Sequence, residues 1–177
     1  IFEEIKNVFT NHPNISVKAT KGNPPEQYEA SYAIQGIYKD DSGRIQHSSN
    51  HIVSITIPFG FPHFPPSCKP KTPIFHPDFD PAAICLGDFW QHDRSISELI
   101  LFIGKMISGE LYSKENTFNE QAALWYRENA DKLPFAKIEG LPDANPIISP
   151  KADALTESIE IDTLEDDDFT SDFNLLG

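Results

Sequence analysis

The sequence predicts one domain of the α+β class, because helical and strand patterns occupy separate blocks of the chain. Helix-spaced apolar residues open the chain, two segments with alternating apolar residues follow, and two capped helical segments come after Cys85. The length of 177 residues fits one domain. We therefore expect a folded domain over residues 1–137 and a tail over residues 138–177.

The N-terminal segment, residues 1–9, predicts a short amphipathic helix. Its apolar residues recur at helical spacing and would form one buried stripe; they are Ile1, Phe2, Ile5, Val8 and Phe9. Asn11, Pro13 and Asn14 are expected to end this helix.

Two segments alternate apolar and polar residues, which is typical of half-buried strands. In the first, residues 26–38, the apolar positions are Tyr28, Ala30, Tyr32 and Ile34; in the second, residues 51–57, they are Val53, Ile55 and Ile57. We expect an antiparallel pair joined by a turn at residues 40–43, Asp-Asp-Ser-Gly.

Residues 58–81 contain eight of the fifteen prolines, which excludes a regular helix or a central strand. A rigid extended path over the surface is expected instead. The aromatic and aliphatic residues between the prolines favour a path that packs against the domain over a free linker; they are Phe59, Phe61, Phe64, Ile74 and Phe75.

The two helical segments after Cys85 each begin with a capping-box pattern, in which two side chains satisfy free amides at the helix entrance. Ser95 with Glu98 begins the first, and Thr117 with Glu120 precedes the second. In the first helix the predicted buried face comprises Ile96, Leu99, Ile100, Ile103 and Ile107, widened by Leu101 and Phe102. In the second, Phe118, Ala122 and Trp125 share a face.

The net charge of −13 comes mainly from the tail, because residues 152–177 hold nine acidic groups and no Lys or Arg. The remaining charge of −4 offers no basic stripe, which argues against nucleic-acid binding. No apolar run of membrane-spanning length is present, so we expect no membrane partner and a cytoplasmic location. The tail is predicted to be disordered, although its scattered apolar residues leave open a motif that folds on a partner.

Cys85 follows a stretch, His-Pro-Asp-Phe-Asp-Pro at residues 76–81, that invites several chemical interpretations. His76, Asp78, Cys85 and His92 lack the paired spacing of a zinc site, so no metal is expected. Neither does Cys85 open a helix, as a papain-like nucleophile would. Ile84 and Leu86 flank it, so these residues alone leave a buried core thiol and a reactive thiol equally open. Cys68 is expected to be a core thiol.

Residues 55–88 contain a strand, a proline-rich loop, a Thr-x-Ile-x-His-Pro-Asp segment at 72–78 and Ile-Cys-Leu at 84–86, in that order. This order resembles the ubiquitin-conjugating enzyme family. The loop positions that match are Pro58, Phe61, Pro62, Pro65 and Pro66. Residues 118–126 are similar to the start of a later family helix, with Phe118, Asn119, Ala122, Ala123 and Tyr126 matching. The resemblance covers about residues 1–135.

The resemblance implies the family fold: an N-terminal helix, a four-stranded antiparallel sheet, an active-site loop and C-terminal helices. It also implies that Cys85 accepts the C-terminal acyl group of a ubiquitin-like protein from an activating enzyme and passes it to a lysine or another nucleophile of a protein substrate. Exchanging one acyl bond for another of similar energy needs positioning and desolvation more than a strong base. No cofactor is expected, since ATP is used by the activating enzyme.

The resemblance also implies roles for the residues around Cys85. Asp78 replaces the usual family Asn, and an ionised carboxylate would repel a developing oxyanion. Asp78 is therefore expected to hold the loop, act while protonated, or engage the incoming amine. Glu115 and Asn116 match the gate that could orient and deprotonate an attacking lysine. His76, expected to be a structural hydrogen-bonding residue, and also Asp88 and Asn119 would support the site.

Partner contacts are expected on the first helix, at Phe2, Ile5 and Lys6, and on the proline-rich loop, at Phe61, His63 and Phe64. The loop after Cys85, residues 86–94, is shorter than the eukaryotic form and lacks its Trp-Ser-Pro-Ala segment, so a conventional ligase partner is in doubt. The sequences of residues 84–88 and 122–126 are similar to those of divergent prokaryotic members of the family. The alternative is a non-catalytic domain of the same fold that binds a ubiquitin-like protein or acts as a scaffold.

Overall fold

The structure is a computed structural model that describes residues 1–134. Its helices are α1 (Phe2–Phe9), α2 (Ile96–Ile107) and α3 (Glu120–Glu128), with short 3₁₀ helices η1 (Gly87–Phe89) and η2 (Ala130–Lys132). Its strands are β1 (Ile15–Gly22), β2 (Pro25–Tyr32), β3 (Gly36–Lys39), β4 (Ile45–Ser48), β5 (His51–Thr56), β6 (Ser67–Pro70), β7 (Phe79–Asp80) and β8 (Ala83–Ile84). The predicted tail, residues 138–177, lies outside the described residues.

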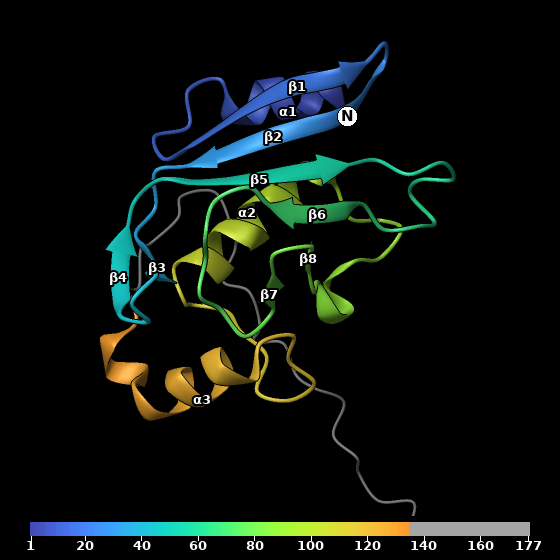
Figure 1. Ribbon diagram of the computed structural model, residues 1–177. Helices are drawn as coiled ribbons and strands as arrows, with labels where there is room; N and C mark the ends of the chain where they lie inside the picture. Colours follow the sequence, from blue (N-terminus) through green and yellow to red (C-terminus); the bar gives the residue numbers. More distant parts are fainter. Residues whose placement is uncertain (135–177) are drawn as a thin grey trace, which may run out of the picture.

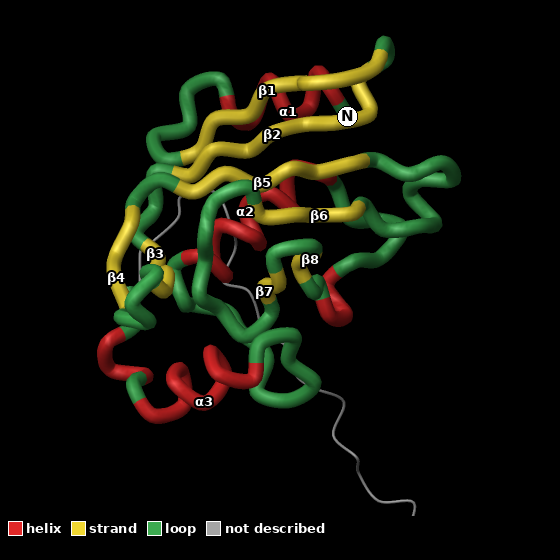
Figure 2. The backbone as a smooth tube through the Cα atoms, in the orientation of Figure 1, coloured by secondary structure: helices red, strands yellow, loops and turns green. Residues whose placement is uncertain are grey.

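The centre of the fold is a four-stranded antiparallel sheet in the order β1-β2-β5-β6 (Figure 1). Two small hairpins, β3-β4 and β7-β8, flank it. The predicted α+β class and the four antiparallel strands are confirmed. Figure 2 shows long loops between β5 and β6 and between β6 and β7. His76 lies in the loop before β7, and Cys85 directly follows β8.

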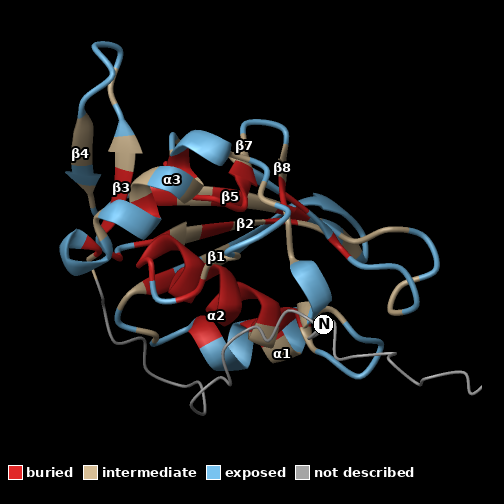
Figure 3. Ribbon diagram, turned by 90° about the horizontal axis from the view of Figure 1, so that it is seen from below, coloured by how far each residue is buried: buried red, intermediate tan, exposed pale blue. Residues whose placement is uncertain are grey.

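Helix α2 forms the centre of the core beneath the sheet (Figure 3). Eleven of its twelve residues are buried, because apolar side chains surround nearly its whole circumference. The predicted capping box is confirmed: Ser95 Oγ accepts from the Glu98 amide, and the Glu98 carboxylate accepts from the Ser95 amide. Tyr32 of β2 donates its hydroxyl to the Ile100 carbonyl at 3.1 Å, which fixes the helix against the sheet.

The predicted stripe on α1 is only partly correct. Ile5 and Phe9 are buried, but Ile1, Phe2 and Val8 are each more than 40% exposed. The helix is only two turns long, so its edges remain in solvent once the central residues reach the core.

The predicted single strand over residues 26–38 is wrong, because the chain bends at residues 33–35 and continues as β3. The predicted turn forms at Asp40, whose carboxylate accepts from the amides of Ser42 and Arg44. It joins β3 to β4, and β5 pairs with β2 through a longer connection. Strand β1 was not predicted from the sequence, and most of its residues are exposed.

The proline-rich segment contains two short strands, β6 and β7. Strand β6 lies at the edge of the four-stranded sheet, where proline is tolerated, and β7 belongs to the small β7-β8 hairpin. The expectation that the apolar residues of the proline-rich segment pack down holds for Phe75, Phe61 and Ile74, which contact the core clusters. It is wrong for Phe59, which is fully exposed, and for Phe64, which is 63% exposed. These two residues lie in the open loop between β5 and β6.

Helix α3 begins at Asn119, whose side-chain oxygen accepts from the Ala122 amide at 3.0 Å. The predicted cap at Thr117 is therefore wrong, as is the placement of Phe118 on the buried face, since Phe118 is half exposed. Ala122 and Tyr126 are buried instead. They belong to a second, smaller core cluster together with Ile37, Phe75 and Leu133.

Candidate active site

Cys85 lies directly after β8 and is half-buried, with its amide donating to the Asp78 carbonyl at 2.8 Å. Both cysteines of the chain are free thiols. Cys68, on β6, is buried in the core, and burial raises the pKa of its thiol to about 12. The prediction that Cys68 is a core thiol is confirmed. Of the two cysteines, Cys85 is the one that is partly exposed.

We expect native protein to react with iodoacetamide at one thiol, Cys85, because Cys68 is both covered and held in its unreactive protonated form. Mass spectrometry of the intact chain should show a single added group in the native state and two in urea. Cys85→Ala should abolish native modification, and Cys68→Ala should leave it unchanged. Rapid native labelling of Cys68 would contradict this assignment.

His76 is a structural residue in this fold. Its ring is fully buried, and its Nε2 donates to the Leu111 carbonyl at 2.9 Å. Its Nδ1 accepts from the Asp78 amide at 3.1 Å. The ring also packs edge-on against Phe79 and Tyr126. With both ring nitrogens engaged, His76 has no free atom for proton transfer.

Burial lowers the pKa of His76 to about 4, against the opposing effect of the Asp78 carboxylate, whose Oδ2 lies 3.8 Å from Nδ1. We take the imidazole as neutral near pH 7, because Nδ1 is already occupied as an acceptor. The approach of His76 Nδ1 to Asp78 Oδ2 therefore reflects their place in one turn, and the two groups do not form an ion pair.

The free energy of unfolding is expected to fall as the pH is lowered from about 6.5 towards 4.5. In this window the unfolded imidazole takes up a proton while the folded one, with its pKa of about 4, stays neutral. The full difference between these pKa values corresponds to about 3 kcal/mol. Urea denaturation at several pH values measures the slope, and His76→Gln should flatten it. An unchanged slope in that variant would assign the effect to another group.

Asp78 connects three segments of the site. Its carbonyl accepts from Cys85, its amide donates to His76, and its Oδ2 accepts from the Ser113 amide at 2.8 Å. The residue is 1% exposed, and its Oδ1 has no hydrogen-bond partner among residues 1–134. Asp78 therefore fixes the cysteine segment to the loop that contains Ser113.

Asn119 adds a fourth connection, because its amide donates to the Pro77 carbonyl at 2.9 Å. Its side chain caps α3 at the same time. Helix α3 is thus attached directly to the His76–Asp78 turn. The supporting role that the resemblance implies for Asn119 stays a prediction.

Glu115 and Asn116 lie in the loop just after Ser113, and both side chains are exposed. Asn116 has a φ of 54°, in the left-handed region that a non-glycine residue rarely adopts. Glu115 lines an open hollow of about 590 Å³ together with Lys114, Glu120 and Arg127. Neither residue makes a hydrogen bond with Cys85 in the described part of the chain, so the connection between them runs through Ser113 and Asp78.

The remaining predicted residues occupy varied positions. Asp88 is exposed in η1, and the structure gives it no hydrogen bond to Cys85. On α1, Phe2 and Lys6 are exposed, whereas Ile5 is a core residue. On the proline-rich loop, Phe61 is half-buried against Trp90, while His63 and Phe64 are exposed. The rings of His63 and His92 lie 6.4 Å apart and mark where the two loops approach each other.

Sequence reasoning missed Ser113 and Leu111, which hold Asp78 and His76. Both act through main-chain atoms, which every residue type carries, so no side-chain pattern could have indicated them. Ser113 and Leu111 fix the position of the His76–Asp78 turn, to which the amide of Cys85 is bonded.

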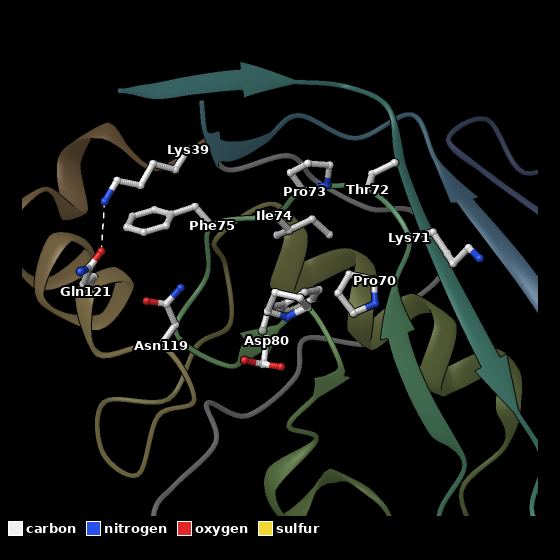
Figure 4. Close-up of a pocket in the computed structure, with 12 residues that line it drawn as sticks. Lys39, Pro70, Lys71, Thr72, Pro73, Ile74, Phe75, Asp80, Asn119 and Gln121 are labelled. Carbon is white, nitrogen blue, oxygen red and sulfur yellow. Dashed lines mark hydrogen bonds between the residues drawn. The ribbon is translucent and has the colours of Figure 1, made fainter. Parts of the chain in front are cut away.

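A separate pocket of about 440 Å³ lies between β3, residues 70–75 and the start of α3 (Figure 4). Lys39 donates to the Gln121 side chain at 3.0 Å along its wall, and Phe75 and Ile74 form part of its apolar lining. Of the predicted site residues only Asn119 reaches it. Neither cysteine lines this pocket, which is distinct from the surroundings of Cys85.

Neither a scan of protein-family models nor a search of curated proteins finds a match to this chain. Within residues 1–134, no helix has both the length and the apolar character needed to cross a bilayer. No cluster of three potential metal ligands forms within the same range, and the four zinc candidates of the sequence do not come together there.

Proposed function

We propose that this chain is a conjugating enzyme for a ubiquitin-like protein, with Cys85 as the acyl acceptor. The observation that carries the proposal is the contrast between the two thiols: Cys85 is accessible and held by its amide at the end of β8, whereas Cys68 is buried. The α+β arrangement with its four-stranded antiparallel sheet is compatible with the family fold implied by the sequence.

In the first step, the Cys85 thiolate attacks the thioester carbonyl of the ubiquitin-like protein on an activating enzyme. A new S–C bond forms at Cys85, and the activating enzyme's cysteine leaves as a thiolate. In the second step, a substrate amine attacks the same carbonyl, loses a proton, and displaces the Cys85 thiolate. ATP serves only the activating enzyme, so this chain uses no cofactor.

Asp78 acts in this mechanism as a positioning residue. Its buried carboxylate already accepts from Ser113, and an acceptor of this kind cannot donate to an oxyanion. By fixing the Ser113 segment, Asp78 holds Glu115 and Asn116 in the loop from which they would orient the incoming lysine. Since both cysteines are free, we place the reaction in the cytoplasm, where thiols stay reduced.

The test is a charging assay with ATP and an activating enzyme and ubiquitin-like protein from the same genome. We expect an adduct that reducing agent removes from the wild-type chain. Cys85→Ser should give an adduct that resists reduction, because an oxyester replaces the thioester, and Cys85→Ala should give none. Cys68→Ala is the matched control and should charge normally. A reducible adduct that persists in Cys85→Ala would refute Cys85 as the acceptor.

A second candidate is a non-catalytic domain that binds a ubiquitin-like protein. It is favoured by Asp78, which leaves the His76–Asp78 turn without the amide side chain that could donate to an oxyanion. Binding of the ubiquitin-like protein that is equally tight in wild type and Cys85→Ala, with no adduct in either, would favour this candidate.

A further inference from the structure

Strand β1 is an edge strand with a free outer side. It pairs only with β2, and in Figure 1 no other strand lies beyond it. The Ala33 amide donates to the Asn14 carbonyl, so the even-numbered residues at the start of β1 bond to β2. The amides of Val17 and Ala19 consequently point outwards and make no hydrogen bond with any other residue of 1–134.

A groove runs along this free edge, between β1 and α1. Its volume is about 400 Å³, and its apolar lining includes Phe2, Ile5, Val17 and Ala19. Phe2 is 43% exposed, which leaves apolar surface open to water. An unpaired edge beside an apolar groove is the arrangement that accepts an added strand.

The solvent-facing side of the same edge carries two lysines, of which Lys18 is already paired with a carboxylate and Lys21 forms no ion pair within residues 1–134. Lys18 and Lys21 pair across the sheet with Glu29 and Gln27, and Lys18 forms an ion pair with Glu29 at 2.8 Å. Lys6 is exposed at the groove on the α1 side. An added strand that fits this edge should therefore be apolar on its inner face and acidic on its outer face.

The chain carries a segment with this pattern at residues 158–163, Ser-Ile-Glu-Ile-Asp-Thr. In a strand, Ile159 and Ile161 would share one face, while Glu160 and Asp162 would share the other. The 23 residues between Pro134 and Ser158 can span up to ~75 Å. That exceeds the width of a domain of this size, whose radius of gyration is about 14 Å.

We propose that residues 158–163 add to β1 as a fifth strand, with Ile159 and Ile161 in the groove beside α1. The apolar face of this segment matches the groove, and its acidic face matches Lys18 and Lys21. The residues that follow it are more acidic and lack this alternation. The added strand comes from the same chain, because residues 135–157 link the segment to the domain and give it a high effective concentration near β1.

The docked strand would cover Phe2 and Lys6, at which partner contacts are expected. This consequence rests on the proposed function: docking would slow charging of Cys85, and release would restore it. The docking itself is tested without any activity measurement, so failure of one proposal leaves the other intact.

The experiment is amide hydrogen exchange by NMR on the full chain, residues 1–177. In wild type, the Val17 and Ala19 amides should be protected. Ile161→Pro removes a strand amide and should speed their exchange at least ~10-fold. The Ser16 and Lys18 amides, which bond to β2, should change little, and Ala154→Pro should leave all four unchanged.

Fast exchange at Val17 and Ala19 in the wild-type chain, or equal protection in Ile161→Pro, would overturn the proposal. Protection that rises with protein concentration, together with a dimer by light scattering, would assign the edge to a second copy and also overturn it.

Discussion

Asp78→Ala is expected to reduce transfer of the acyl group from Cys85 to lysine about 100-fold while leaving charging of Cys85 nearly unchanged. The substitution removes the acceptor of the Ser113 amide, and a displaced loop moves Glu115 and Asn116 from the attacking amine. Cys85 itself stays in place, since it is bonded to the main chain of residue 78. Single-turnover discharge of the preformed thioester onto free lysine measures the effect.

Asp78→Asn is the matched control for this prediction. The amide oxygen can still accept from Ser113, so discharge should remain at or above the wild-type rate. The thermal midpoint should not fall, because a buried carboxylate with one unpaired oxygen is replaced by a neutral group. If Asp78→Asn loses as much discharge as Asp78→Ala, the charge itself takes part in transfer and the positioning role is refuted.

Gly36→Ala is expected to lower the free energy of unfolding by about 3 kcal/mol. A Cβ at this position would lie 2.8 Å from His51 Nε2 and 2.9 Å from both the carbonyl oxygen and Cγ2 of Ile107. None of these atoms can move freely: His51 and Ile107 are buried, and His51 Nε2 is hydrogen-bonded to the Ser48 carbonyl. Thermal unfolding should show a midpoint about 10 °C lower.

Gly43→Ala separates this clash from the general cost of replacing glycine. Gly43 lies in the Asp40 turn at a φ of 80°, and the nearest atom to an added Cβ is Lys39 Cε at 3.7 Å. Its cost should be about 1 kcal/mol, from backbone strain alone. Equal losses in the two variants would show that close packing around Gly36 is not what limits stability.

The elements that the sequence predicted well are those whose signals are local. The cap at Ser95 and the buried residues of α2 need no information beyond the helix itself. The bend at residues 33–35, the pairing of β3 with β4, and the cap at Asn119 depend on contacts with distant residues. Asn119, for example, is held by the carbonyl of Pro77, which is 42 positions away and has no side-chain signal.

The candidate site divides in the same way. The residue types at Cys85, His76, Asp78 and Asn119 and their resemblance to family motifs drew attention from the sequence, and Cys68 was expected to be a core thiol. The link from Asp78 to Ser113 could not be predicted, because its donor is a main-chain amide brought close by the fold. Exposure of Phe59 and Phe64 was also unpredictable, since apolar composition alone does not tell a core residue from a loop tip.

The main-chain bonding of residue 78 also bears on how this site can evolve. The amide and carbonyl that hold His76 and Cys85 are present whatever side chain the position carries. Only the tie to Ser113 depends on the side chain, and both carboxylate and amide oxygens can make it. An exchange between asparagine and aspartate should therefore have little effect on the position of Cys85. A substitution at this position can therefore change the chemistry of the side chain near Cys85 while the main-chain hydrogen bond to Cys85 is kept.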